Sequence, residues 1–224
     1  MNRSAARIVR EYGPFTGVDQ VHGVTYDGRQ VWIATGERLD AFDPASGDMV
    51  RSIPLAADAG TAFDGEHLFQ IAHGRIQKID PHSGRVLSTI AAPGDGGQSG
   101  LTWAEGSLWV GQYPERKIYQ IDPDTGAVLR TIESNRFVTG ITWVDGELWH
   151  GTREGDESQL RHIDPRSGEV LETVDMPAGA GISGLESNGA DLFFCGGGSS
   201  GLVRAVQRPA RDRGSESPIV STSE

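Results

Sequence analysis

The chain has 224 residues and one cysteine, and its 20 lysine and arginine residues against 31 aspartate and glutamate residues give a formal net charge of −11. This balance argues against nucleic-acid binding, because phosphate backbones are themselves negative. With no apolar run of membrane-helix length and no signal-peptide core, we expect a cytoplasmic protein without nucleic-acid or membrane partners, long enough for one large domain or two small ones.

The 31 glycines follow a pattern along the chain. Five similar segments each begin with a glycine and carry an aromatic residue nine positions later, and they open at Gly23, Gly60, Gly100, Gly140 and Gly184. Successive openings are separated by 37, 40, 40 and 44 residues. A repeat of about 40 residues, rich in strands and turns, is typical of the blades of a β-propeller.

Each repeat predicts four short strands. The first runs from the opening glycine to an Asp-Gly, Glu-Gly or Asn-Gly pair that favours a tight hairpin turn, and the second carries the aromatic residue, which we expect in the core between blades. In four of the five repeats the third ends at an Asp-Pro-x-Ser/Thr-Gly turn, in which aspartate bonds the backbone ahead and glycine takes a positive φ. The fourth strand is predicted over residues 49–53, 86–90, 128–132 and 170–174.

The fifth repeat has no clear fourth strand after Val203–Val206, and the N-terminus supplies a candidate. The segment Arg7–Tyr12 resembles residues 127–132 and is predicted to complete the last blade and close the ring. Closure of this kind protects the free strand edges. The sequence thus predicts an all-β, five-bladed propeller of four-stranded blades over residues 1–207, followed by a mobile polar tail over residues 208–224.

A functional site is expected on one face of the ring. The first-to-second and third-to-fourth turns are short and uniform, whereas the other connections vary in length and composition. Variable loops on a rigid scaffold commonly carry function. We therefore place the site at the axial mouth on the face of the variable loops.

Two residues depart from their columns near the axis. The residue before each opening glycine is His22 in the first repeat, and it is small in the others. The residue two positions after the glycine is Glu186 in the last repeat, against threonine or alanine elsewhere. A carboxylate in a narrow, partly dry mouth should have a raised pKa, which suits a general base, and histidine can relay a proton. The alternative is that Glu186 bonds strand backbone or water and His22 caps a loop.

Further side chains are expected near the mouth from the variable loops and the residues before the opening glycines. As substrate-binding candidates the sequence offers Tyr113, Arg153, His73, Gln112, Ser183 and Ser99. Arg153 could pair with a substrate carboxylate, and the alternative for each loop residue is an ordinary exposed side chain. The sequence leaves open whether a divalent ion is bound on the axis. A site made of His22, His73 and His150 would require side chains from different positions in the repeat to converge, so no metal ligands are assigned.

The blade pattern, with Leu-Trp in the second strand and Ile-Asp-Pro-x-Thr-Gly after the third, resembles the five-bladed glutamine cyclotransferase family and related lyase and lactonase propellers. The resemblance covers roughly residues 7–207. That family converts N-terminal glutamine to pyroglutamate with carboxylates at the axial mouth. Leu185-Glu186 is similar to its Glu-Leu-Glu motif, which implies that Glu186 is the matching acid. Val21-His22-Gly23-Val24 and Ser99-Gly100-Leu101 stand where the family has Phe-Thr-Gln-Gly-Leu and Glu-Gly-Leu.

Two hypotheses about function follow. The first is an enzyme that performs acid/base chemistry on a small polar substrate at the mouth, by cyclisation, elimination or ester opening, with Glu186 and His22 as the proton-transfer pair. The second is a non-catalytic propeller whose loops bind a ligand or a protein. The oligomeric state is not indicated by the sequence.

Overall fold

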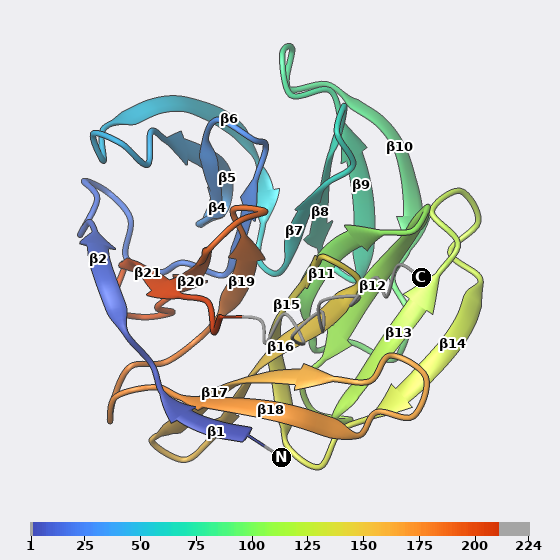
Figure 1. The fold of residues 1–224 in the computed structure, drawn as a ribbon. Helices are drawn as coiled ribbons and strands as arrows, with labels where there is room; N and C mark the ends of the chain where they lie inside the picture. Colours follow the sequence, from blue (N-terminus) through green and yellow to red (C-terminus); the bar gives the residue numbers. More distant parts are fainter. Residues whose placement is uncertain (1, 211–224) are drawn as a thin grey trace, which may run out of the picture.

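The computed structural model describes residues 2–210, which form five blades around a central axis (Figure 1). Blades one to three are made of β3 (Gly23–Tyr26), β4 (Val31–Ala34), β5 (Gly36–Phe42) and β6 (Met49–Ala57); β7 (Thr61–Phe63), β8 (Leu68–Ala72), β9 (Arg75–Ile79) and β10 (Val86–Ala91); and β11 (Gln98–Ala104), β12 (Ser107–Gln112), β13 (Lys117–Ile121) and β14 (Val128–Glu133). Blades four and five contain β15 (Phe137–Val144), β16 (Glu147–Glu154), β17 (Glu157–Ile163) and β18 (Val170–Asp175); and β19 (Gly184–Ser187), β20 (Leu192–Gly196) and β21 (Val203–Gln207). The predicted five-bladed, all-β propeller is confirmed.

The N-terminal segment closes the ring, as predicted. Strand β2 (Ile8–Tyr12) pairs antiparallel with β21 and becomes the fourth strand of blade five. The sequence did not predict β1 (Asn2–Ala5), which pairs parallel with β18 as a fifth strand of blade four. Its four residues are all exposed and show no apolar alternation, so it lacks the pattern that marks a half-buried strand. Figure 1 shows this blue segment running along the outer edges of two neighbouring blades.

The opening glycines let the innermost strands approach one another. A Cβ on Gly100 would lie 2.7 Å from the backbone nitrogen of Ile141 and 2.8 Å from the backbone oxygen of Thr139, both in blade four. The opening glycines of the other four repeats face the backbone of the next blade in the same way, and Gly184 closes the circle against Val24. Real Cβ contacts are essentially never this short, so these positions require glycine.

The predicted turns follow from local backbone geometry. In blades three and four, the paired residues Glu105-Gly106 and Asp145-Gly146 all have positive φ, which is the conformation of a type I′ hairpin. The turn after the third strand is joined to the preceding blade by arginines on that blade's fourth strand. Arg10 donates to the carbonyls of Pro44, Ala45 and Ser46, and Arg130 donates to Pro165 at 3.0 Å.

The aromatic residue of each second strand packs between blades, as predicted. Trp32, Trp109 and Trp149 are each 1% exposed, and the corresponding phenylalanines Phe69 and Phe193 are also buried. One core cluster, for example, joins Trp109 of blade three to residues of β15, β16 and β17 in blade four. Burial of large side chains at each seam holds neighbouring blades together.

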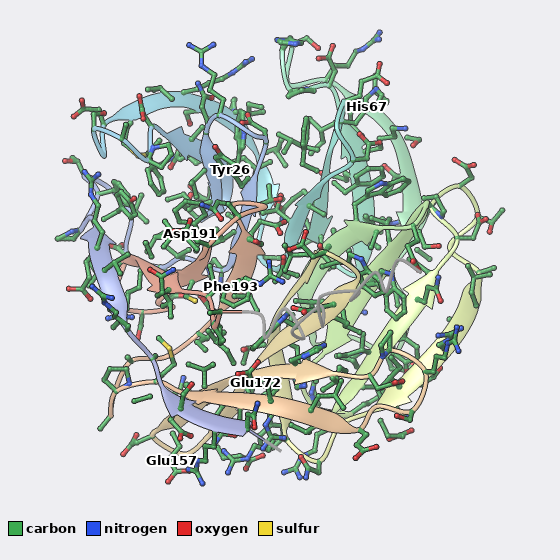
Figure 2. All side chains as sticks on the ribbon, in the orientation of Figure 1. Tyr26, His67, Glu157, Glu172, Asp191 and Phe193 are labelled. Carbon is green, nitrogen blue, oxygen red and sulfur yellow. The ribbon has the colours of Figure 1, made fainter. Side chains whose placement is uncertain are left out.

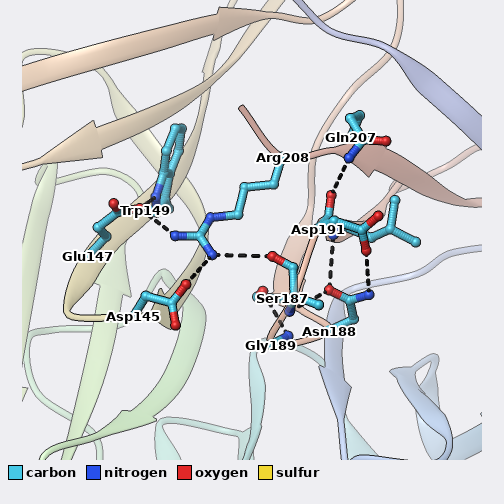
Figure 3. A network of polar contacts seen from close by, with 11 residues as sticks. Asp145, Glu147, Trp149, Ser187, Asn188, Gly189, Asp191, Gln207 and Arg208 are labelled. Atoms are coloured by element: carbon cyan, nitrogen blue, oxygen red, sulfur yellow. Dashed lines mark hydrogen bonds and ion pairs between the residues drawn. The ribbon is translucent and has the colours of Figure 1, made fainter. Parts of the chain in front are cut away.

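The structure corrects the sequence boundary at the C-terminal end. Arg208, assigned to a mobile tail, is buried and forms ion pairs of 2.7 Å with both Asp145 and Glu147 (Figure 3). Glu147 also accepts a hydrogen bond from the Trp149 indole nitrogen, so Arg208 ties the end of blade five to the first hairpin of blade four. Residues 211–224 of the predicted tail lie outside the described residues.

We expect Arg208→Ala to lower the free energy of unfolding by about 2 kcal/mol, because two carboxylates lose a buried partner but Asp145 keeps partial access to water. Urea unfolding monitored by tryptophan fluorescence measures this difference. Arg7→Ala serves as the control, since Arg7 is exposed and its side chain forms no ion pair within residues 2–210. Equal effects of the two substitutions would contradict the role given to Arg208.

Over residues 2–210, the fold has no helical segment with the length and apolar character needed to cross a lipid bilayer.

Candidate functional site

A polar cavity of about 260 Å³ lies at the axial mouth, on the face of the variable loops. Its walls come from the connections that precede the innermost strands, from the loops after β12 and β20, and from the end of β16. Five of the eight residues proposed from the sequence line it: His22, Ser99, Tyr113, Arg153 and Ser183. The structure therefore brings most of the expected side chains to one place, while Glu186, His73 and Gln112 do not line the cavity.

Tyr113 and Arg153 are held at the mouth by their surroundings. The ring of Tyr113 stacks on Phe137 of blade four with a centroid distance of 4.7 Å, so the tyrosine bridges blades three and four. The Nε atom of Arg153 donates to the carbonyl of Gly155 at 3.2 Å. Within residues 2–210 the guanidinium of Arg153 forms no ion pair, which leaves its terminal nitrogens able to bind an anion.

A carboxylate that the sequence analysis missed completes the polar lining. Asp58, at the entrance to blade two, is the one acidic residue among the described residues that line the mouth. Its Oδ2 atom accepts a hydrogen bond from the backbone of His73 at 3.3 Å and lies 3.7 Å from the Nε2 atom of that histidine. The residues two before each opening glycine are Val21, Asp58, Gln98, Val138 and Ile182. Asp58 and Gln98 are polar where the other three blades have apolar residues, and this difference could have identified Asp58 from the sequence.

His73 and Gln112 are corrected as mouth residues. His73 has a φ of 52° and its side chain is 79% exposed, so it stands outside the cavity and reaches it only through Asp58. Gln112 is fully buried, and its Nε2 atom lies 3.5 Å from the carbonyl of Pro93. This side chain therefore lies under the connection before blade three, beside Pro93 and Gly94.

The two serines at the mouth act first as contacts between blades. The hydroxyl of Ser99 donates to the carbonyl of Val138 at 2.8 Å, and that of Ser183 donates to the carbonyl of Val21. Ser183 also accepts a hydrogen bond from the backbone of Gly198 at 2.9 Å. Because each hydroxyl proton is held by a backbone oxygen, neither serine is arranged as a nucleophile, and both can only accept a further bond from a ligand.

Glu186 lies deeper, between the innermost strands of blades four, five and one. Its carboxylate accepts hydrogen bonds from the hydroxyl of Thr25 at 3.0 Å, from the hydroxyl of Thr142, and from the backbone of Ser187 at 2.9 Å. Burial raises the pKa of Glu186 to about 7, against the opposing effect of these three hydrogen bonds. The side chain is 9% exposed. Its raised pKa agrees with the prediction, but its closest partners are structural hydroxyls.

The spacing along β19 separates Glu186 from the mouth. Ser183 lines the cavity and Glu186 follows three residues later, which in a strand is about 10 Å further along the axis. His22 lines the cavity in the neighbouring blade one, directly after Val21, whose carbonyl accepts the hydrogen bond from Ser183. The two residues expected to form a proton-transfer pair therefore do not share the cavity.

Other reactive side chains are buried in the core. His150 hydrogen-bonds the carbonyl of Gly151 at 3.2 Å, and burial lowers its pKa to about 4, so it is neutral at pH 7. Burial raises the pKa of Cys195 to about 12, which keeps it a thiol. In the part of the chain that the structure describes, no three His, Cys, Asp or Glu side chains are grouped to hold a metal ion.

A second cavity of about 230 Å³ adjoins the mouth at the seam of blades four and five. The two cavities share Arg153, Ile182, Ser183 and Gly198. The remaining lining of the second cavity is mostly glycine and serine. Arg153 therefore stands at the junction of two adjacent polar spaces.

The fold and the site define a five-bladed β-propeller with a polar cavity at the axial mouth. A family model, PQQ_2, described as outer membrane protein assembly factor BamB, matches residues 72–208, more than half of the chain. The chain belongs to this family. Among curated proteins, no significant match is found.

Solved structures confirm the fold. The chain is similar to Myxococcus xanthus glutaminyl cyclase, with a TM-score of 0.76 and 19% identity over 92% of this chain and 97% of that one. It is also similar to the WD40 propeller domain of Doa1 (TM-score 0.55, 18% identity, 84% and 64% covered) and to Kuenenia stuttgartiensis hydrazine synthase (TM-score 0.51, 17% identity, 80% and 56% covered). The resemblance to cyclotransferase propellers is thus confirmed for the fold.

Proposed function

We propose that the axial mouth is the active site of an enzyme that binds a small polar molecule with a negatively charged group and performs acid/base chemistry on it. The observation that carries this proposal is the convergence of four side chains, His22, Asp58, Tyr113 and Arg153, from four consecutive blades on one cavity. The cavity lies at the mouth of a closed ring and receives a few convergent polar side chains, as is common for small-molecule sites.

Each side chain has a role that its chemistry supports. Arg153 binds the anionic group of the substrate with its terminal guanidinium nitrogens. Tyr113, fixed by its stacking on Phe137, offers a phenolic hydrogen bond. His22 and Asp58 accept and return a proton, which allows cyclisation, elimination or ester opening. Glu186 lies about 10 Å along the strand from the mouth. It would contact only a substrate that reaches between the innermost strands.

The similarity to glutaminyl cyclase, at 19% identity, supports the propeller architecture alone. A second candidate function is a binding propeller without catalysis. It is favoured by the family description, which names an assembly factor and not an enzyme. In that case the same mouth would bind an anionic ligand or a protein segment without turnover.

A ligand screen with matched variants tests the proposal. We expect a small carboxylate from a panel of amino acids, lactones and hydroxy acids to raise the melting temperature, equivalent to about 2.7 kcal/mol at 100 times its Kd. Arg153→Gln should weaken this binding about tenfold or more. Arg166→Gln, which removes an exposed arginine from a turn on the opposite face, is the control. Equal responses of the two variants, or no response to any compound, would contradict the proposed site.

Turnover of the compound that binds separates the two functions. His22→Asn and Asp58→Asn should each lower kcat by about 100-fold or more while binding persists, because they remove proton transfer and not the anion contact. Product formation is followed by mass spectrometry. Binding without any turnover by the unaltered protein would support the non-catalytic propeller instead.

A further inference from the structure

A larger groove lies on the opposite face of the propeller, at the seam between blades one and two. Its volume is about 870 Å³, against about 260 Å³ for the mouth, and it shares no lining residue with the mouth. Figure 2 marks the two blades by Tyr26 and His67. The groove is walled by the first hairpin turns of both blades, by β6, and by the turn between β9 and β10.

Arginines line this groove at positions where other blades have none. Three residues before the second-strand aromatic, the five blades have Arg29, Glu66, Gly106, Gly146 and Ala190. Directly after the glycine of the Asp-Pro turn, the four blades that contain this turn have Asp48, Arg85, Ala127 and Glu169. Arg29 of blade one is thus the one basic residue in the first of these positions, and Arg85 of blade two is the one basic residue in the second. Both line the same groove.

Arg29 and Arg85 are not paired with carboxylates. Across residues 2–210, neither Arg29 nor Arg85 forms an ion pair, and both are exposed. Arg51, a third arginine of the groove, is fixed in place because it donates to the carbonyl of His82 and lies 5.9 Å from the centroid of the Trp32 ring. The groove therefore contains three arginines and three carboxylates, Asp27, Glu66 and Asp80, but within residues 2–210 no ion pair joins one of these arginines to a carboxylate.

Three acidic residues line the groove: Asp27 and Asp80 have structural roles in its turns, and Glu66 is exposed in the first hairpin turn of blade two. Asp27 accepts hydrogen bonds from the backbone of Arg29 at 2.8 Å and from the Trp32 indole at 2.8 Å. Asp80 accepts from the backbone of His82 at 2.8 Å, as the matching aspartates do in the other turns of this kind. The oxygens of Asp27 and Asp80 therefore serve turns that the fold repeats, and Arg51 repeats the contact made by Arg10 and Arg130, whereas Arg29 and Arg85 belong to this seam alone.

We propose that this groove binds a small organic anion with at least two anionic groups, one held by Arg29 of blade one and another by Arg85 of blade two, with Arg51 as a fixed third cation. Guanidinium groups bind carboxylates and phosphates in the same bidentate manner. Phosphate and polycarboxylate compounds are therefore the two sources of the ligand. The groove is independent of the mouth and of the activity proposed there.

Calorimetric titration with tripolyphosphate and, separately, with citrate tests this site and distinguishes the two sources. We expect at least one probe to bind the full chain at low ionic strength, and the Arg29→Gln/Arg85→Gln double variant to bind it about tenfold or more weakly. The Arg75→Gln/Arg166→Gln double variant removes the same charge from exposed positions outside the groove and should bind as the unaltered protein does. Far-ultraviolet circular dichroism confirms that the variants are folded.

Three results would overturn the proposal. They are no binding of either probe at about 1 mM, equal weakening by both double variants, and binding of an oligoglutamate peptide in the absence of small-anion binding, which would mark the groove as a protein-docking site. Arg153→Gln separates this site from the mouth. Loss of probe binding in that variant would assign the anion to the mouth and contradict the groove, whereas retained binding supports it whatever the fate of the proposed activity.

Discussion

Gly100→Ala is expected to lower the free energy of unfolding by about 3 kcal/mol. The added Cβ would lie 2.7 Å from the nitrogen of Ile141 and 2.8 Å from the oxygen of Thr139. These are backbone atoms of the innermost strand of blade four, and they cannot turn away as a side chain can. To relieve the clash, blades three and four must move apart where their innermost strands meet, and this movement also loosens the packing around Trp109 between the two blades.

Chemical unfolding followed by tryptophan fluorescence measures the loss, with Gly181→Ala as the control. A Cβ on Gly181 has no atom within 4 Å, and Gly181 is not among the glycines with positive φ. We expect its substitution to change stability by no more than about 0.5 kcal/mol. A loss at Gly100 as small as that at Gly181 would show that the ring is not limited by contacts between its innermost strands.

Glu186→Gln is expected to stabilise the protein at alkaline pH by about 3 kcal/mol and to have little effect near pH 4. The pKa of Glu186 rises from 4.5 to about 7 on folding, chiefly because the carboxyl is buried. The folded state therefore binds the proton more tightly than the unfolded state. The stability that this proton provides is complete below about pH 4.5 and is lost as pH rises through about 7.

Glutamine reproduces the protonated form, because its amide can accept from Thr142 and Ser187 and donate to Thr25. Unfolding free energies of both proteins at several pH values between 4 and 9 measure the difference, and exposed Glu66→Gln provides the control. A difference between the unaltered protein and Glu186→Gln that stays constant over this range would contradict a raised pKa at the axis.

The architecture was predictable because its signals are local and repeated. The opening glycines, the Asp-Gly, Glu-Gly and Asn-Gly hairpin turns and the Asp-Pro turns each require a particular backbone conformation. The blades and the closing strand β2 could therefore be predicted from the sequence. Strand β1 did not, because its ladder with β18 depends on backbone pairing and on the Arg3–Asp175 ion pair, neither of which leaves a pattern in four exposed residues.

The site was predictable in part. The column comparison singled out His22 and Glu186 as exceptions, but it did not show how far along the innermost strands the cavity extends. His22 lines the mouth, whereas Glu186, three residues beyond Ser183 on β19, lies deeper. Asp58 was not predicted, although it and Gln98 are the polar residues in the otherwise apolar column two positions before the opening glycines. The groove between blades one and two required the structure, since Arg29 and Arg85 come together only when neighbouring hairpins do.

The pairing of β2 with β21 also sets the order of events during protein synthesis. Residues 8–12 leave the ribosome long before residues 203–207, their partners in the last blade. At about 5 to 20 residues per second, this strand waits roughly 10 to 40 s with its backbone donors and acceptors unpaired. Its charged residues Arg10 and Glu11 disfavour pairing of this free edge with other nascent chains until β21 has been made.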